Sequence, residues 1–335
     1  MKRVGIVGNG LMGGWHAAQW KQLPVELVGY YDHHIERSST FAERYGGRAF
    51  ESLDALLQEV DIIDVCTPTP EHAVPVIAAA RAGKHIVCEK PLARHLKDAE
   101  AMIAACEEAG VRLFVAQVVR FFPEFAQAKQ VFDSGALGTP GVVRTVRGGN
   151  FPRPNDWYGD FELSGGVILD LAIHDIDYLR WLFGDVTRVF ARGLAFQNIP
   201  ATDHALITLR FRNGAIGHIE GSWAFPAGTF RTFLEIAGSE GVLTHDSLAT
   251  SPLSVQLTED AAAEGGKVTI PGGMIAPTDD PYYRELKHFL DCLASGEATL
   301  VAPEDGLAAL KIALAATESV RTGKPVDIST FKEAQ

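Results

Sequence analysis

Cysteine is scarce in this sequence, and its four residues are far apart. They are Cys66, Cys88, Cys106 and Cys292, with no CxxC pair among them. Secreted disulfide scaffolds are dense in cysteine, whereas proteins of a reducing compartment are not. We therefore expect a cytoplasmic protein. The cysteines and histidines also match no zinc-ligand spacing, so we expect no metal site.

Long hydrophobic runs and clusters of positive charge are also missing. The apolar helical stretch at 307–316 is interrupted by Lys311 and is too short to span a bilayer. The basic pair at 2–3 precedes a short apolar run broken by glycine, which indicates a strand rather than a signal peptide. With a formal net charge of -12 and no stripe of Lys and Arg, the sequence predicts neither a nucleic acid nor a membrane as partner.

What is present is the composition of a soluble α/β protein. One hydrophobic core rarely exceeds about 250–300 residues, so a chain of 335 residues is expected to form two domains. Residues 1–118 alternate short apolar runs with amphipathic stretches, which predicts a doubly wound parallel sheet, the Rossmann fold. Residues 119–335 hold several strands with short turns, such as Asn213-Gly214, which predicts an α+β domain with an antiparallel sheet. The last helix, about 304–321, could pack back on the first domain.

A glycine motif follows the first predicted strand. Gly8, Gly10 and Gly13 have the GxGxxG spacing, which permits a tight turn, close approach to a pyrophosphate and close helix packing. Asp32 ends the second predicted strand, where a carboxylate accepts ribose hydroxyls and repels a 2′-phosphate. We therefore expect NAD, with NADP less favoured. The expected contacts from this part of the chain are Gly8, Asn9, Gly10, Leu11, Met12, Gly13, Asp32 and His33.

Two later segments lie at the ends of predicted strands, where ligands bind in open α/β sheets. Thr67-Pro68 forms a stiff loop after the fourth strand, and His72 follows just inside the next helix. Glu89-Lys90 ends the fifth strand, and the proline after it restricts Lys90 to an extended conformation. We expect these residues at the cofactor. For His72 and Lys90, a surface position is an equally open interpretation.

An acid–base pair is predicted further along the chain. Asp170 and His174 are four residues apart on a predicted helix over about 168–183, so they share one face. A carboxylate beside an imidazole suits general acid–base chemistry, although such pairs are also common on helix surfaces. The preceding Gly165-Gly166 would let the helix approach a ligand closely. We expect Asp175 to cap a helix or to bond between domains.

Together these segments resemble the Gfo/Idh/MocA family, named after glucose–fructose oxidoreductase, inositol dehydrogenase and rhizopine catabolism. The resemblance rests on GNGLMG at 8–13, CTPTPEH at 66–72, CEKPLA at 88–93 and GGVILDLAIHDID at 165–177. It covers almost the whole chain. It implies a Rossmann domain and a C-terminal domain whose large open antiparallel sheet packs against another subunit, hence a homodimer or homotetramer.

The resemblance also implies a reaction. The chain would transfer a hydride between NAD and a carbinol carbon of a small polyol or sugar, such as an inositol, an aldose or a sugar acid. Lys90 matches the family's catalytic lysine, and Asp170 and His174 match its acid–base pair. His174 would take the hydroxyl proton while Lys90 hydrogen-bonds the same oxygen. Gln117 aligns with a polar residue near the nicotinamide.

The substrate is expected to be a small molecule held largely by the second domain. The candidate contacts are Arg120, Phe121, Asn150, Asn155, Trp157, Tyr158, His174 and Tyr283. Trp157 and Tyr158 could stack on a sugar ring or simply pack. Two alternative functions exist in such proteins: a glycosidase with an internal NAD redox cycle, and a redox-silent NAD-sensing regulator. The three intact catalytic positions count against the regulator.

Overall fold

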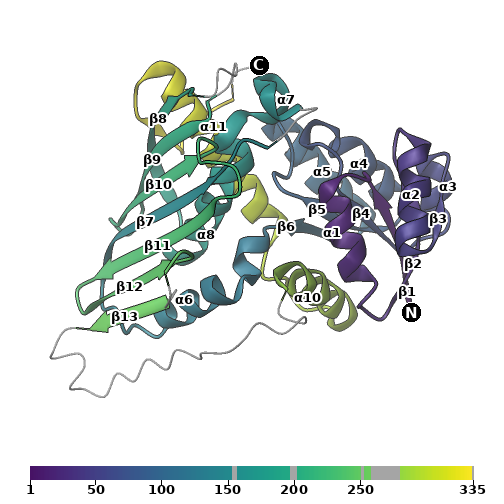
Figure 1. The fold of residues 1–335 in the computed structure, drawn as a ribbon, viewed down its shortest axis with the longest axis horizontal. Coiled ribbons are helices and arrows are strands. Elements are labelled where there is room, and N and C mark those ends of the chain that lie inside the picture. Colours follow the sequence, from purple (N-terminus) through teal and green to yellow (C-terminus); the bar gives the residue numbers. More distant parts are fainter. Residues whose placement is uncertain (153–156, 197–201, 250–252, 258–279, 334–335) are drawn as a thin grey trace. The chain divides into compact units, whose positions relative to one another are not determined.

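The computed structural model describes residues 1–152, 157–196, 202–249, 253–257 and 280–333. By its internal contacts the chain divides into two compact units. The first comprises Met1–Phe121 and Ile275–Leu307, and the second comprises Phe122–Met274 and Ala308–Gln335. Figure 1 shows both units, each of which is built on its own sheet.

The first unit contains a six-stranded parallel sheet in the order β3-β2-β1-β4-β5-β6. The strands are β1 (Lys2–Val7), β2 (Val25–Tyr31), β3 (Arg48–Ala49), β4 (Ile62–Val65), β5 (His85–Glu89) and β6 (Leu113–Ala116). Strands β4 and β6 are buried along their whole length, which is typical of a sheet covered on both faces. The predicted doubly wound Rossmann sheet is confirmed.

The helices of this unit connect the strands. They are α1 (Leu11–Trp20), α2 (Ile35–Tyr45), α3 (Leu53–Leu57), η1 (Thr69–Glu71), α4 (Ala73–Arg81), α5 (Leu96–Ala109), η2 (Val118–Phe121) and α10 (Pro281–Ser295). Sequence analysis had placed the α10 segment in the second domain. The structure groups it with the first unit, because Phe289 stacks on Phe114 of β6 with ring centroids 4.9 Å apart.

The second unit contains an eight-stranded sheet in the order β13-β12-β11-β7-β10-β9-β8-β14. The strands are β7 (Pro140–Gly149), β8 (Val186–Leu194), β9 (His204–Phe211), β10 (Ile216–Ser222), β11 (Phe230–Gly238), β12 (Gly241–Asp246), β13 (Leu253–Leu257) and β14 (Val326–Asp327). Neighbouring strands are antiparallel except β7 and β10, which are parallel. The expected large antiparallel sheet is therefore confirmed in the main, but the sheet is mixed.

Helices cover one face of this sheet (Figure 1). They are α6 (Pro123–Asp133), η3 (Trp157–Gly159), α7 (Phe161–Ser164), the π-helix η4 (Ile168–Ala172), α8 (Ile173–Phe183) and α11 (Pro303–Thr322). The contact with η4 is close, because a Cβ on Gly221 of β10 would lie 3.0 Å from the Cβ of Ala172. On α11, the Ser319 hydroxyl accepts the Ala191 N–H of β8 at 2.9 Å. The boundary between the units falls within α11.

A buried ion pair joins sheet and helix in the second unit. Arg147 Nε of β7 lies 2.7 Å from Oδ2 of Asp175 on α8, and both side chains are almost fully buried. The Arg147 guanidinium also lies over the ring of Phe125. Asp175 thus forms an ion pair within its own unit. The expectation of a cap or a bond between domains was wrong, because strand and helix residues distant in sequence meet only in the folded core.

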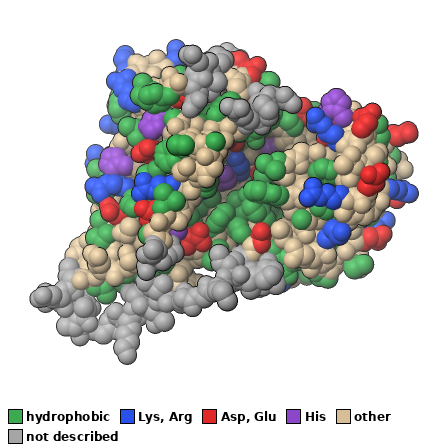
Figure 2. Space-filling view, viewed as in Figure 1, with side chains coloured by type: hydrophobic (Ala, Val, Ile, Leu, Met, Phe, Trp, Pro, Cys, Tyr) green, Lys and Arg blue, Asp and Glu red, His purple; other side chains and the backbone are tan. Residues whose placement is uncertain are grey.

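The surface agrees with the charge of the sequence. On the face shown in Figure 2, side chains of both signs are mixed, with no continuous basic strip among the described residues. Among the helices of the described part of the chain, none has the length and apolar character needed to cross a membrane.

Asp175→Ala should destabilise the protein strongly. It leaves the Arg147 guanidinium buried without its carboxylate, at a cost of about 3–5 kcal/mol. Asp185→Ala is the matched control in the same unit, because its ion pair with Arg212 is exposed and should contribute under about 1 kcal/mol. Urea unfolding measures both. Equal losses in the two variants would contradict the structural role of the buried pair.

Candidate active site

The glycine turn between β1 and α1 leaves no room for a side chain at Gly8 or Gly13. Gly8 has φ +94°, and a Cβ there would lie 2.5 Å from the Thr67 nitrogen in the loop after β4. A Cβ on Gly13 would lie 2.2 Å from the Gly8 oxygen. Nothing lies within 4 Å of a Cβ on Gly10, so its backbone is open to a ligand. No side chain caps the start of α1, whose N–H groups suit a pyrophosphate.

Asp32 ties this turn to the end of β2. Its Oδ2 accepts the Asn9 N–H and its Oδ1 accepts the His34 N–H, each at 2.9 Å. The carboxylate keeps further lone pairs that can accept ribose hydroxyls. Arg37 Nη1 lies 3.9 Å from Oδ1 of Asp32. We did not predict this contact, because Arg37 lies further along the chain, in the first turn of α2. His33 is exposed and pairs with Glu71 at 3.4 Å.

His72 connects two loops at the carboxyl edge of the sheet. It is buried, with Nε2 2.9 Å from the Thr67 oxygen and Nδ1 3.0 Å from the Pro91 oxygen. The ring therefore links the loop after β4 to the loop after β5. The alternative solvent position was wrong, because the chain buries this helix start beneath the second loop, and the cofactor contact stays a prediction.

Lys90 and Gln117 lie at the ends of neighbouring strands. Glu89 and Ala116 are paired residues of β5 and β6, and Lys90 and Gln117 directly follow them. Lys90 is half-buried, its N–H donates to Oε2 of Glu89 at 3.0 Å, and its peptide bond to the following proline is cis.

Several buried polar atoms of this unit have no partner among the described residues. Among them are the side-chain amide nitrogen and oxygen of Gln117, the Thr67 hydroxyl and Oδ1 of Asn9. Leaving such atoms unpaired costs about 1–3 kcal/mol each, so native proteins usually supply a partner. A bound dinucleotide would supply one along the carboxyl edge of this sheet. Together with the glycine turn and Asp32, these atoms fit NAD. Leu11 is exposed and Met12 half-buried at the start of α1.

The predicted acid–base residues belong to the second unit. Asp170 lies in η4 and His174 in α8, and both are half-buried. A single α-helix was expected over this stretch, but its first turn is π-helical, a feature often found at functional sites. Gly165 and Gly166 precede it with φ +71° and +70°, a region that favours glycine.

Two of the predicted substrate residues are core residues of the first unit. Arg120 is 2% exposed, and its Nη1 donates to the Leu300 oxygen at 2.7 Å and to Asp305 at 3.1 Å. Phe121 is buried edge-on against Phe289, with ring centroids 5.9 Å apart. Both side chains are buried because α10 and the segment after it pack over η2, and this packing gives them partners within the protein. Their assignment to the substrate stays a prediction.

The remaining substrate candidates are less buried. Trp157 and Tyr158 stack on each other with ring centroids 4.3 Å apart. Asn150 is exposed at the end of β7, and Tyr283 is half-buried, its N–H bonded to the N-cap Asp280 of α10. Asn155 lies outside the described residues.

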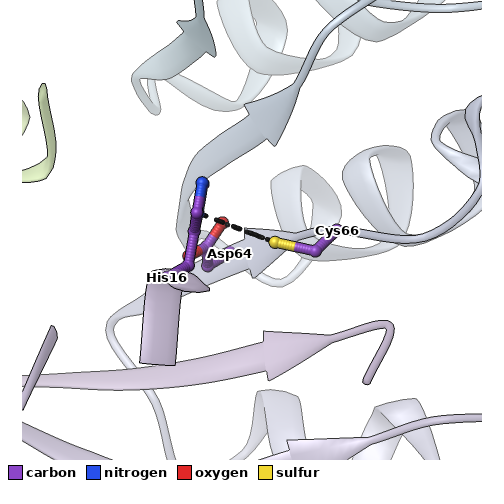
Figure 3. Close-up of side chains that lie close together, drawn as sticks. All are labelled: His16, Asp64 and Cys66. Carbon is purple, nitrogen blue, oxygen red and sulfur yellow. Dashed lines mark hydrogen bonds and ion pairs between the residues drawn. The ribbon is translucent and has the colours of Figure 1, made fainter. Parts of the chain in front are cut away.

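A buried charged cluster behind the glycine turn was not predicted. His16 of α1 lies close to Asp64 of β4 and to Cys66 (Figure 3). On its other side it lies 3.1 Å from Glu89 of β5. Tyr282 of α10 packs against the His16 ring, with centroids 5.9 Å apart. The only signal in the sequence is a histidine on a short helix, which does not reveal two carboxylates from distant strands.

Comparison with known proteins agrees with this architecture. Residues 2–117 match the oxidoreductase family with the NAD-binding Rossmann fold, and residues 125–244 match the GFO/IDH/MocA C-terminal domain. The chain is 33% identical over 336 residues to the myo-inositol 2-dehydrogenase of Thermotoga maritima, covering 97% of this chain and 98% of that protein. It is 30% identical over 337 residues to the scyllo-inositol 2-dehydrogenase (NAD(+)) of Bacillus subtilis, covering 97% and 96%.

Solved structures show the same fold. A probable dehydrogenase from Thermotoga maritima has a TM-score of 0.83 and 30% identity, over 98% of this chain and 99% of that chain. Levoglucosan dehydrogenase in complex with NADH and L-sorbose has a TM-score of 0.85 and 25% identity, over 98% of both chains. With both domains matched and relatives aligned over their full length, this chain belongs to the Gfo/Idh/MocA family of oxidoreductases and has its NAD-binding Rossmann domain.

Proposed function

We propose that this protein transfers a hydride between NAD and a secondary carbinol carbon of a cyclic polyol or sugar. The observation that carries the proposal is the carboxyl edge of the first unit, where Lys90 and the buried, unpartnered Gln117 amide end neighbouring strands. Relatives named for myo-inositol, scyllo-inositol and levoglucosan support a cyclic polyol or sugar as the substrate.

Each proposed catalytic residue has one task. His174 accepts the proton of the substrate hydroxyl, and Asp170 orients the imidazole and stabilises its charged form. The Lys90 ammonium hydrogen-bonds the same oxygen and stabilises the negative charge that develops there. Asp32 would hold the ribose of NAD and the glycine turn its phosphates, and the bound cofactor would supply the hydride acceptor for the substrate carbon.

We propose that aromatic faces bind the apolar side of the substrate ring. The stacked pair Trp157 and Tyr158 presents such a surface in the second unit. Asn150 and Tyr283 remain proposed polar contacts. We also propose a cytoplasmic location, supported by four cysteines that are all buried and free.

We further propose a homodimer or homotetramer formed through the open face of the eight-stranded sheet, the face that carries Leu206, Val146 and Phe233. Strand register aligns these three side chains across β9, β7 and β11, with Glu220 of β10 between the first two. Leu206 is 53% exposed. Aligned apolar side chains on an exposed sheet face are typical of an interface between subunits.

Lys90→Ala and His174→Ala should each lower kcat by about 10²–10⁴-fold, because each removes a group that acts on the reacting oxygen. The affinity for NAD, measured by quenching of protein fluorescence, should persist. The substrate is identified first, by following NADH absorbance with inositols, aldoses, anhydrosugars and sugar acids. Lys97→Ala, an exposed lysine of α5, is the control. Wild-type rates in either variant would remove that residue from the mechanism. Cleavage of aryl glycosides without net formation of NADH would instead favour the alternative function, a glycosidase with an internal NAD redox cycle.

Asp32→Ala should narrow the preference for NAD over NADP by roughly tenfold or more. Hydrogen bonds to a charged group contribute about 1.5–3 kcal/mol, and the variant also removes the repulsion of a 2′-phosphate. The ratio of kcat/KM for the two cofactors measures this effect, with Asp54→Ala on the exposed side of α3 as control. An unchanged ratio would show that Asp32 does not bind the ribose.

Leu206→Glu combined with Phe233→Glu should yield a monomer, because it places like charges across a symmetric apolar interface. Analytical ultracentrifugation measures the mass. Val74→Glu introduces the same charge at an exposed apolar residue of α4 and should leave the assembly intact. A monomeric wild-type protein, or an unchanged oligomer in the double variant, would reject this interface.

A further inference from the structure

The buried cluster around His16 contains more negative than positive charge. His16 Nδ1 lies 2.9 Å from Oδ2 of Asp64, and Nε2 lies 3.1 Å from Oε1 of Glu89 (Figure 3 shows the Asp64 side). His16 and Asp64 are 0% exposed and Glu89 is 5% exposed. One imidazole therefore lies between two carboxylates that have almost no access to water.

This geometry favours the doubly protonated ring. A neutral imidazole carries one N–H, so one of its nitrogens would turn a lone pair toward a carboxylate. The contact of Nε2 with Glu89 is an ion pair by distance and does not have hydrogen-bond geometry, so the attraction between these two groups is one of charge. Burial is the largest single effect on the pKa of His16 and would lower it, but the charge of Asp64, the hydrogen bond to Asp64 and the contributions of Cys66 together hold that pKa well above the ordinary value. Asp64 also accepts the indole N–H of Trp20 at 2.7 Å, which helps to hold its carboxylate in place.

Glu89 connects this ring to the proposed catalytic lysine. Its Oε1 faces His16, and its Oε2 accepts the backbone N–H of Lys90 at 3.0 Å. The carboxylate thereby fixes the first peptide of the Glu89-Lys90-Pro91 turn. Tyr282 lies on the same side, where burial and the charge of Glu89 raise the pKa of its hydroxyl.

We propose that His16 is a positioning residue whose protonated ring holds the Glu89 carboxylate in place, so that Glu89 orients Lys90. The inference rests on the catalytic role proposed above for Lys90. Without the imidazolium, Glu89 would be a buried carboxylate with only one backbone N–H donor described for it, and it would turn toward another cation or take up a proton. Either change would move the start of the lysine turn, and displacements of about 1 Å cost up to about 100-fold in rate.

A metal ion is the competing explanation for this cluster. His16, Asp64 and Cys66 bring one potential ligand atom each within 4.8 Å of one another. A cysteine binds a metal ion as its thiolate, whereas in the metal-free protein burial raises the pKa of the Cys66 thiol, whose sulfur lies 3.5 Å from Oδ1 of Asp64. The direct contact between His16 and Asp64 also fills the space that an ion would need. The cluster is therefore better explained by charge pairing.

The kinetic test uses His16→Gln, Glu89→Gln and the double variant. Each single variant should lower kcat by about tenfold to 100-fold, with little change in NAD affinity. If His16 acts through Glu89, the double variant should have a kcat no lower than that of the slower single variant. Both substitutions would then remove the same interaction, so their effects on kcat would not multiply. His85→Gln, the same substitution at the half-buried first residue of β5, is the control and should keep the wild-type kcat.

A second measurement does not depend on activity or on the folding of His16→Gln. In protein labelled with ¹⁵N-histidine and free of cofactor, one ring should remain doubly protonated at pH 8, and its signal should shift toward the neutral form in Glu89→Gln. A neutral His16 in the wild-type protein would overturn the proposal. So would a wild-type kcat in His16→Gln, or multiplicative losses in the double variant.

The two proposals fail in different ways. A wild-type rate in Lys90→Ala would overturn the proposed reaction and, with it, the role of His16. A strong loss in Lys90→Ala combined with an unaffected His16→Gln would overturn the positioning role alone and leave the proposed reaction standing.

Discussion

The packing of the turn after β1 against the loop after β4 is the constraint on which the cofactor site depends. No side chain fits at Gly8 or Gly13, and this close approach brings the start of α1 to the carboxyl edge of the sheet. The same approach lets Asp32 bond the Asn9 N–H. It also sets His16, a little further along α1, between strands β4 and β5. The turn proposed to bind the phosphates, the proposed ribose contact of Asp32 and the buried charge cluster therefore share one steric cause.

The two units bury charge in different ways. In the second unit, Arg147 and Asp175 form a balanced pair that joins sheet and helix. In the first unit, the His16 imidazole lies beside two carboxylates, those of Asp64 and Glu89. Negative charge therefore exceeds positive charge next to the turn that carries Lys90. A balanced pair suffices for packing, whereas a surplus costs desolvation energy and is expected near sites that bind or move charge.

Sequence reasoning was most successful where function depends on local backbone chemistry. Glycines at fixed spacing, strands buried on both faces and the Asn213-Gly214 hairpin were all predicted, because each depends on neighbours in the chain. Sequence reasoning did not predict the protein partners of side chains that bond residues far away in the chain. Arg120 bonds a segment 180 residues away, and His72 bonds the loop after the next strand. A polar residue in a motif does not show whether its partner is a ligand or the protein itself.

The sequence by itself determined the fold class, the cofactor-binding turn and the family, since periodicity, glycine spacing and contiguous motifs are properties of short stretches. Only the tertiary structure decided that β7 and β10 run parallel, that α10 packs on β6 and η2, and that His16 lies between Asp64 and Glu89. These features arise from contacts between residues far apart in the chain. Their free energy depends on burial and charge in the assembled core, which no local pattern encodes.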